Sequence, residues 1–360
     1  MIKKDFIPQA YAYTVDGQVF SYESPSNIAL IKYWGKYGDQ LPKNPSLSFT
    51  LAVSSTTTHL HIKKLEEPVS DFSFEVLLDG EPKPKFEPKI QQFLERIEEY
   101  LPFLKSYHFK IETSNSFPHS SGIASSASGM SALALCLMEV ERTLLPTMSP
   151  EYFNTKASFL SRLGSGSACR SLQGPLVVWG EHVGVNGSSD LYGSPYTLPV
   201  HGVFKDFQDT ILLVDTGEKQ VSSTVGHNLM LRHPYADARF EQAHQDLADL
   251  INVLEKGDLD TFMALVEREA LALHAMMMTS RPYFILMKPN TLEIINAIWE
   301  FRHNTGNPVC FTLDAGANVH VLYPASVKVE VMAFIKNTLT PYCQDGKYIC
   351  DAVGFGAKKL

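Results

Sequence analysis

Four short segments of this sequence collect residue types that bind anions or move protons. In the first, an apolar run at 28–31 leads into Lys32-Tyr-Trp-Gly-Lys36, which places two ammonium groups and a phenol within five residues. Such a set suits an anionic ligand, because an ammonium group binds phosphate as a compact point charge. The alternative is a strand end whose lysines are solvated, and for Lys32 and Lys36 taken alone that is the commoner situation.

The second segment, residues 117–127, reads Phe-Pro-His-Ser-Ser-Gly-Ile-Ala-Ser-Ser-Ala and runs into a long predicted helix. Backbone N–H groups at a helix N-terminus attract phosphate, and Gly122 permits its close approach. The hydroxyls of Ser125 and Ser126 are available to phosphate or Mg²⁺. The spelling is not the GxxxxGK[ST] pattern of a Walker A loop. On its own, the segment is explained equally well by a serine-capped helix start.

The third segment, residues 162–171, reads Arg-Leu-Gly-Ser-Gly-Ser-Ala-Cys-Arg-Ser and is a second candidate for an anion-holding loop. Its Arg170 can bind a carboxylate through two parallel hydrogen bonds. The alternative is a flexible Gly/Ser connector, which is harder to accept for a second loop of this kind in one chain. Cys169 is a potential nucleophile, but no partner base is evident, and a small packing residue is the preferred interpretation.

The fourth segment, residues 311–318, reads Phe-Thr-Leu-Asp-Ala-Gly-Ala-Asn and places Asp314 on a tight turn between two predicted strands. A buried carboxylate close to cationic groups stays ionised, and it can then orient or deprotonate a hydroxyl group. The alternative is an aspartate that caps its own turn, which is the commoner use of a lone Asp-Ala-Gly sequence.

The elements that must position these segments are a mixture of strands and helices. Alternating or short apolar runs predict strands at 28–31, 49–53, 60–62, 74–78, 108–113, 176–179, 211–214, 309–312 and 319–323. Helical spacing of apolar residues predicts helices at 89–100, 124–145, 236–255, 259–278, 291–301 and 327–339. Because strands and helices come in blocks and not in strict alternation, the predicted fold class is α+β.

Composition narrows the kind of protein. The chain has 360 residues, 44% apolar and 19% charged, which fits one large globular domain or two closely packed ones. A formal charge of −8 gives no broad basic surface, so no nucleic-acid partner is predicted. Five widely spaced cysteines predict neither a disulfide framework nor a zinc site. Without a signal-peptide pattern or a run of about 20 apolar residues, we expect a cytoplasmic protein with no membrane partner.

Taken together and in this order, the four segments resemble the mevalonate diphosphate decarboxylase family of the GHMP kinase superfamily. The matching pieces are Asn27-Ile-Ala with Lys32-Tyr-Trp-Gly-Lys36, Phe117-Pro with Gly122-Ile-Ala-Ser-Ser-Ala127, Gly164-Ser-Gly-Ser-Ala-Cys-Arg-Ser171, Val221-Ser-Ser-Thr224, and Asp314-Ala-Gly with Asn318. The resemblance covers most of the chain. Its Lys-Tyr-Trp-Gly-Lys and Gly-Ser-Gly-Ser-Ala-Cys-Arg pieces are highly specific, whereas the Ser-Ser-Ala loop is typical of the whole superfamily.

The resemblance implies a two-lobed GHMP kinase-like fold with its active site in the cleft between the lobes. A ribosomal protein S5 domain 2-like lobe would occupy residues 1–200, and a ferredoxin-like lobe residues 201–360. The implied reaction uses ATP and Mg²⁺ to phosphorylate the C3 hydroxyl of mevalonate 5-diphosphate. Phosphate and CO₂ then leave, which gives isopentenyl diphosphate for isoprenoid biosynthesis. The resemblance also implies a homodimer.

Residue roles carry over by position in the matching segments. Asp314 matches the catalytic aspartate, Lys32 the lysine beside it, and Arg170 the arginine that grips the substrate carboxylate. The residues matched to substrate binding are Tyr33, Trp34, Gly35, Lys36, Lys89, Ser165, Gly166, Ser167, Ala168, Cys169, Arg170, Ser223 and Thr224. The residues matched to ATP and Mg²⁺ are Ser120, Gly122, Ser125, Ser126 and Lys219, with no dedicated protein cage for the metal.

Other activities remain alternatives at this point. Thr224 stands where some relatives carry arginine, which leaves the choice between a monophosphate and a diphosphate substrate open. A mevalonate 3-kinase and a phosphomevalonate decarboxylase are the alternatives within the superfamily, although Lys32, Arg170 and Asp314 together favour the complete reaction. A non-catalytic ligand-binding homologue is expected to lack Asp314 or the lysines, and this sequence keeps them.

Overall fold

The computed structural model of the chain describes residues 1–118, 123–217 and 223–360, without the side chains of residues 223 and 224. Its strands are β1 (Val19–Ile31), β2 (Lys36–Tyr37), β3 (Leu41–Pro42), β4 (Ser46–Lys64), β5 (Ser73–Leu78), β6 (Glu81–Pro82), β7 (Tyr107–Asn115), β8 (Leu176–Trp179), β9 (Ser194–Pro195), β10 (Gln208–Leu212), β11 (Cys310–Thr312), β12 (Val319–Tyr323), β13 (Tyr348–Ala352) and β14 (Lys358–Lys359). Its helices are α1 (Glu87–Ile97), α2 (Ser125–Leu144), α3 (Pro150–Gly164), α4 (Ser223–Asn228), α5 (Ala236–Lys256), α6 (Leu259–Met278), α7 (Pro289–Thr305) and α8 (Lys328–Phe334). The predicted α+β class is confirmed.

The first sheet is built around the long strands β1 and β4. Its order is β14-β1-β4-β7-β5-β6, and β8 and β9 extend it from the other end of β4. The strands predicted at 49–53 and 60–62 are two ends of this one strand, β4. The polar run between them, residues 54–58, hides that continuity from a hydrophobicity pattern. Three of those five residues are threonines, whose branched side chains favour extended backbone.

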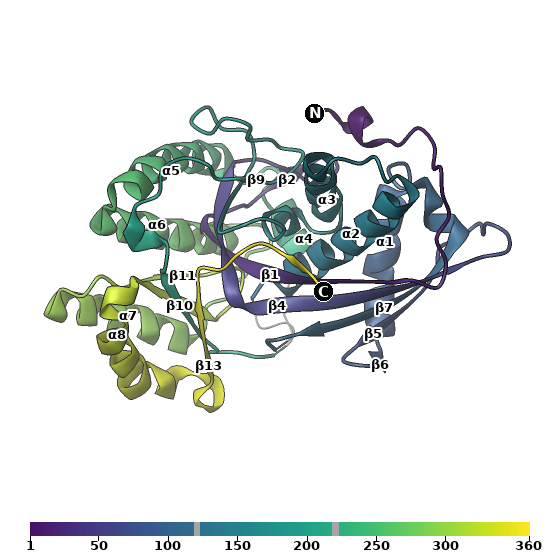
Figure 1. The fold of residues 1–360 in the computed structure, drawn as a ribbon. Helices are drawn as coiled ribbons and strands as arrows, with labels where there is room; N and C mark the ends of the chain where they lie inside the picture. The colour runs from purple at the N-terminus through teal and green to yellow at the C-terminus, as the bar shows by residue number, and fades with distance from the viewer. Residues whose placement is uncertain (119–122, 218–222) are drawn as a thin grey trace.

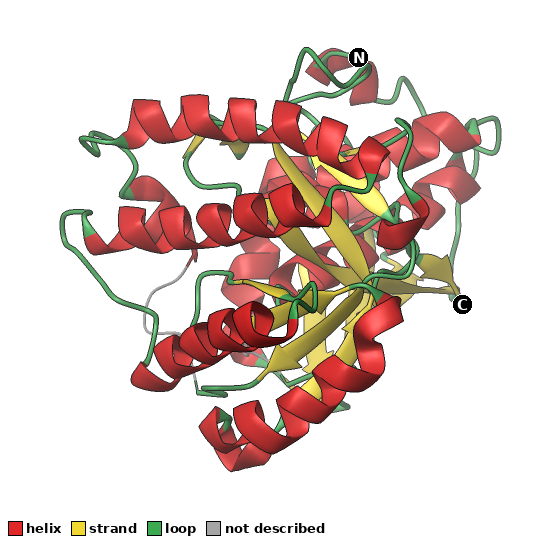
Figure 2. Cartoon of the chain, turned by 90° about the vertical axis from the view of Figure 1, so that its left-hand side faces the viewer, coloured by secondary structure: helices red, strands yellow, loops and turns green. Residues whose placement is uncertain are grey.

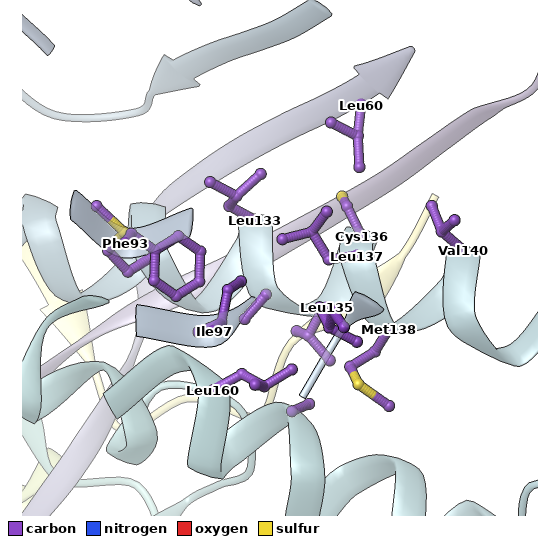
Figure 3. Close-up of a cluster of buried hydrophobic side chains, with 14 of the residues drawn as sticks. Leu60, Phe93, Ile97, Leu133, Leu135, Cys136, Leu137, Met138, Val140 and Leu160 are labelled. Atoms are coloured by element: carbon purple, nitrogen blue, oxygen red, sulfur yellow. The ribbon is translucent and has the colours of Figure 1, made fainter. Parts of the chain in front are cut away.

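Helices α1, α2 and α3 cover one face of this sheet (Figure 1). Helix α2 lies between the strands and the other two helices, so it is buried on most of its surface, as predicted. Figure 3 shows Leu133 and Leu137 of α2 among Leu60 of β4, Phe93 of α1 and Leu160 of α3. This packing fixes the N-terminal end of α2 against the sheet, and that end carries one of the serine-rich segments.

The second sheet has the order β11-β12-β10-β13. One of its faces packs on α7 and α8, and a second core joins its other face to β1, β4, α5 and α6. Figure 2 views this end of the molecule and shows long helices on both sides of the strands. Because Ile28 and Leu30 of β1 share that second core with Ile211 and Leu322, the two sheets meet over an apolar interface.

The chain does not keep its two halves strictly apart. The short strand β14 returns from the second half of the chain to pair with β1, with Lys358 opposite Glu23 and Lys359 opposite Tyr22. Val353 bridges to Leu51 of β4 just before this return. The division of the chain at residue 200 therefore stays a prediction.

Three helical segments differ from the sequence-based expectation, and one of them is the short helix α4, which was not predicted. Helix α3 was not predicted, although Ser149 caps it by accepting the Tyr152 N–H and Pro150 occupies its first turn, which are recognisable start signals. The single helix predicted at 327–339 is instead α8 followed by a π-helical turn, Ile335–Leu339. The buried residues Val331, Ile335 and Leu339 recur every four positions.

In the part of the chain that the structure describes, no helix combines the length and the apolar character needed to cross a bilayer.

Candidate active site

Lys32 and Asp314 form an ion pair at the junction of the two sheets. Lys32 directly follows β1, and Asp314 lies in the turn between β11 and β12. The Nζ atom of Lys32 is 3.2 Å from Oδ1 of Asp314, with the lysine side chain 2% and the aspartate side chain 27% exposed. Burial lowers the pKa of the Lys32 ammonium, and the Asp314 carboxylate opposes that shift. The pair brings together the residues predicted as the catalytic centre.

Helix α6 holds the backbone on both sides of this pair. The Lys32 N–H donates to Oε2 of Glu269 at 2.7 Å, and Nε2 of His274 lies 3.1 Å from the Asp314 carbonyl oxygen. Glu269 is in turn bound by Arg239 at 2.6 Å. Sequence reasoning missed these supporting residues. The available signal was that Glu269 and His274 lie among many apolar residues of one helix, since such groups stay buried only with partners.

Arg170 lies at the end of the 3-10 turn Gly166–Arg170 and lines the cavity. Its Nε donates to Ser48 Oγ and its Nη1 to Ser46 Oγ, both at 2.6 Å, so β4 fixes the plane of the guanidinium. The side chain is buried, and within the described residues no carboxylate lies within 4 Å of it. A buried cation held only by neutral hydroxyls keeps its charge for an anionic ligand, which fits the predicted carboxylate contact.

The residues of the Lys-Tyr-Trp-Gly-Lys segment lie partly on the cavity wall and partly in the protein core. The Tyr33 ring lines the cavity and packs at 4.5 Å from Trp179. Trp34 is buried beneath it and still reaches the cavity wall. Gly35 has φ +98°, and a Cβ atom there would meet Phe240 at 2.9 Å, so only glycine suits this turn.

Lys36 emerges from that turn toward the cavity. Its Nζ donates to Gln40 Oε1 at 2.6 Å. Burial lowers the pKa of Lys36, and the nearby positive charge of Arg96 lowers it further. An ammonium group in this setting is stabilised by a bound anion, which is consistent with the sequence-based assignment of Lys36 to substrate binding.

The two serine-rich segments meet at one wall of the cavity. Ser165, Gly166 and Ser167 of one and Ser125 and Ser126 of the other line it. The Oγ atoms of Ser126 and Ser165 are 3.3 Å apart. These two predicted loops therefore converge on one wall of the cavity, beside the N-terminus of the long helix α2, where backbone N–H groups favour anions.

Other predicted site residues lie behind this wall or outside the description. Ala168 and Cys169 are buried and do not line the cavity. The Cys169 thiol donates to the Gly166 carbonyl at 3.1 Å, and burial raises its pKa to about 12, so it is a packing residue as interpreted from the sequence. Ser120, Gly122 and Lys219 lie outside the described residues. Ser223 and Thr224 begin helix α4, but their side chains also lie outside the description.

A row of cationic side chains lines the opposite wall. Lys89, which was predicted, lies on α1 with Arg96 two turns further along, and Lys85 precedes the helix. Arg96 is oriented by a hydrogen bond from its Nη1 to the Leu163 carbonyl at 2.9 Å. Lys85 and Arg96 were missed, although Lys89 and Arg96 are seven residues apart and residues with that spacing share a helix face.

These walls enclose a cavity of about 630 Å³. Its polar end is formed by Lys32, Arg170, Asp314 and the serine loops, and it continues between the first sheet and helices α1 and α2 over Val76, Ile111 and Leu133. Within the described residues, no three His, Cys, Asp or Glu side chains are grouped as a metal site. The arrangement can hold a polyanion against several fixed cations while one carboxylate faces a reacting group.

Comparison with known proteins matches both halves of the chain. A family model described as the diphosphomevalonate decarboxylase-like N-terminal domain matches residues 24–190. A second, described as the mevalonate 5-diphosphate decarboxylase C-terminal domain, matches residues 210–353. The diphosphomevalonate decarboxylase mvd1 of Aspergillus fumigatus is 30% identical over 336 residues, which are 88% of this chain and 80% of that relative.

Solved structures show the same similarity. A mevalonate diphosphate decarboxylase from Legionella pneumophila has 30% identity and a TM-score of 0.77, over 92% of this chain and all of that one. The structure of MDDEF in complex with MVAPP, AMPPCP and magnesium has 26% identity and a TM-score of 0.80, over 95% and 98% of the two chains. The predicted two-lobed fold is thereby confirmed.

Proposed function

This chain belongs to the diphosphomevalonate decarboxylase family, and we propose that it converts mevalonate 5-diphosphate to isopentenyl diphosphate in an ATP-dependent decarboxylation. The enzyme class is a carboxy-lyase of the mevalonate pathway. The observation that carries the proposal is the Lys32–Asp314 pair at the floor of a cavity whose walls offer Arg170, Lys36 and two serine loops.

The first step is attack by the C3 hydroxyl of the substrate on a phosphoryl group. Asp314 is suited to accept the proton of that hydroxyl, because the hydrogen bond from Lys32 Nζ orients its carboxylate. His274 and Glu269 fix the backbone of both residues, which reduces the rearrangement required during the reaction. Phosphoryl transfer depends mainly on such positioning and on charge neutralisation, not on a covalent protein intermediate.

The second step breaks two bonds and forms an alkene. As the C3–O bond to the departing phosphate lengthens, positive charge develops at C3, and the electrons of the C–CO₂⁻ bond become the new double bond. Arg170 is placed to hold the carboxylate, since Ser46 and Ser48 leave its charge unneutralised. We expect the rigid guanidinium of Arg170 to hold the carboxylate in one orientation. In that orientation the C–CO₂⁻ bond that breaks is aligned with the positive charge developing at C3.

The diphosphate group is assigned to the cationic wall. By resemblance, Tyr33 and Lys36 match contacts to the diphosphate and Lys89 matches a substrate-binding residue; Arg96 and Lys85 line the same cavity. Thr224 supplies no charge where some relatives carry arginine, and Arg96 adds one on the opposite wall. This count of cations supports a diphosphate substrate over a monophosphate.

The residues present also suit ATP and Mg²⁺. Ser125 and Ser126 stand at the N-terminus of the 20-residue helix α2, where backbone N–H groups and the helix dipole favour phosphate. Their hydroxyls, together with phosphate oxygens, are the kind of ligand that Mg²⁺ takes when proteins hold it through a nucleotide. When bound, ATP with Mg²⁺ supplies the phosphoryl group and neutralises its charge. Ser120, Gly122 and Lys219 are proposed to take part in the same site.

Further properties are proposed on the resemblance. We propose two lobes dividing near residue 200, a homodimer and a cytoplasmic location. The four buried cysteines and the exposed Cys350 are all unpaired, which supports a reducing compartment.

The experiment that tests the function is a coupled assay with purified protein, ATP and Mg²⁺, and either mevalonate diphosphate or mevalonate monophosphate. ADP and CO₂ should appear in equal amounts from the diphosphate. ADP without CO₂ would identify a 3-kinase, and turnover of the monophosphate alone would identify a phosphomevalonate decarboxylase. The absence of both products would support a non-catalytic ligand-binding protein.

A further inference from the structure

A histidine that the sequence-based reading did not single out lies in the wall of the cavity. His227 belongs to α4 and is buried, with 8% of its surface exposed. Its ring lies 4.2 Å from the Tyr33 ring and 4.6 Å from the Trp34 ring. The preceding Gly226 allows this approach, because a Cβ atom there would lie 2.5 Å from Trp34. The histidine is therefore packed directly on the segment assigned to the substrate.

A backbone hydrogen bond determines which ring nitrogen carries the proton. The Gly35 N–H donates to Nδ1 of His227 at 3.0 Å. Since an amide N–H can only donate, Nδ1 is unprotonated, and the neutral ring carries its proton on Nε2. Within the described residues, no group accepts a hydrogen bond from that Nε2–H. The ring thus presents a fixed donor on a residue that lines the cavity.

Burial and the nearby positive charges keep the imidazole ring of His227 neutral. Burial lowers its pKa to about 3, and the positive charges of Lys36 and Arg170 act in the same direction. The aromatic rings that pack against it, Tyr33 and Trp34, add no charge at neutral pH. Because the ring is neutral, its Nε2–H can donate to an anionic oxygen without adding a third positive charge to those of Lys36 and Arg170.

We infer that His227 is a substrate-positioning residue whose Nε2–H donates a hydrogen bond to an oxygen of the diphosphate group. The inference rests on the proposed function and adds one contact to it. The diphosphate is the expected acceptor because Tyr33, which matches a diphosphate contact, packs on the ring, and Lys36, which matches another, directly follows the Gly35 amide that binds it. The hydrogen bond from Gly35 has a second effect, since it ties the turn that aims Lys36 to the same imidazole.

The first test observes the imidazole itself, with inorganic pyrophosphate as the probe and no turnover. In protein labelled with ¹⁵N-histidine, Nε2 of His227 should carry the proton in the free enzyme. Adding pyrophosphate should shift the Nε2–H resonance and raise the pKa of the ring, because a nearby anion favours the charged form. A Nε2–H resonance that stays unchanged at saturating pyrophosphate would overturn the inference, even if His227 supports the fold.

The second test uses variants. His227→Leu removes both hydrogen bonds and should raise the KM for mevalonate diphosphate about 10- to 100-fold, as expected for a hydrogen bond to a charged group. His227→Gln retains an acceptor for Gly35 and a donor toward the cavity, so its KM should change by less than about threefold. If the leucine variant does not fold, the glutamine variant and the pyrophosphate titration still decide the question.

A matched control is available in His233, which accepts the Tyr235 N–H on its Nδ1 in the same way but contacts Thr279 and does not line the cavity. His233→Gln should leave the KM unchanged. A KM for His227→Leu equal to that of the parent enzyme would refute the contact. Because pyrophosphate binding is measured apart from CO₂ release, a failure of the proposed reaction and a failure of this inference are distinguishable.

Discussion

Lys32 and Asp314 are 282 positions apart in the sequence, yet Nζ of the lysine and Oδ1 of the aspartate are separated by 3.2 Å. The lysine directly follows a strand of the first sheet, and the aspartate lies in a turn of the second. Their contact therefore depends on how the two sheets pack together. A change that shifts this interface should therefore alter the contact between Lys32 and Asp314 before it unfolds either sheet.

Replacing the proposed base is the most direct test of the site. Asp314→Asn keeps the shape of the side chain and removes its charge, so kcat should fall by about 10³-fold or more while the nucleotide Kd changes little. The measurement is steady-state turnover beside nucleotide binding by calorimetry. Normal turnover in a correctly folded variant would exclude Asp314 as the base.

The geometry of Arg170 should matter as much as its charge. Arg170→Lys retains a cation but cannot contact Ser46, Ser48 and a carboxylate together, so we expect kcat to fall about 100-fold. Measuring ADP and CO₂ separately will show whether phosphorylation or decarboxylation is affected. Parent-like values for both products would remove Arg170 from the site.

Arg96 provides a test of substrate specificity. Arg96→Gln should raise the KM for mevalonate diphosphate about tenfold, because a charge on the cavity wall is lost while the helix is retained. Lys105→Gln is the control, since Lys105 pairs with Glu98 outside the cavity. An equal KM for the Arg96 variant and the control would show that Arg96 does not contact the diphosphate.

His274 should make stability depend on pH. Burial lowers its pKa to about 4, compared with about 6.5 in the unfolded chain. The unfolded state therefore binds the extra proton between these values, so this contribution is complete above pH 6.5 and is lost as the pH falls toward 4. The free energy of unfolding should decrease by up to about 1.4 kcal/mol per pH unit in that window.

Urea unfolding across the same pH window measures this effect. His274→Gln can still donate to the Asp314 carbonyl but does not titrate, so its curve should be flatter than that of the parent protein. Parallel curves for the two proteins would show that His274 is not the titrating group.

The cysteines should differ sharply in reactivity. Cys350 is exposed, whereas Cys169 is buried and has a pKa raised to about 12 by that burial. Iodoacetamide should therefore alkylate Cys350 alone in the native protein and leave activity unchanged, because thiolate and access are both required. Mass spectrometry of tryptic peptides will locate the label. Rapid loss of activity with label on Cys169 would contradict its packing role.

The sequence by itself determined which local segments carry the chemistry. A lysine pair after an apolar strand, two serine loops before or after helices, and an aspartate on a turn are local patterns, and the structure brings the described members of all four together. The elements around them were also local: α2, α5 and α6 were found within a few residues of their ends because their apolar spacing is strong. Their place in one site followed from the resemblance, not from spacing.

Only the tertiary structure decided which distant residues complete the site. Arg96 and His227 sit on helices with ordinary sequences, and Glu269 and His274 lie in a helix whose pattern predicts only burial. Even the continuity of β4 depended on partners, since β1 and β7 pair with its polar middle on both edges. The role of a residue in the site depends on the residues that pack against it. Hydrophobic periodicity indicates that a side chain is buried, but it does not identify the partner that the side chain contacts.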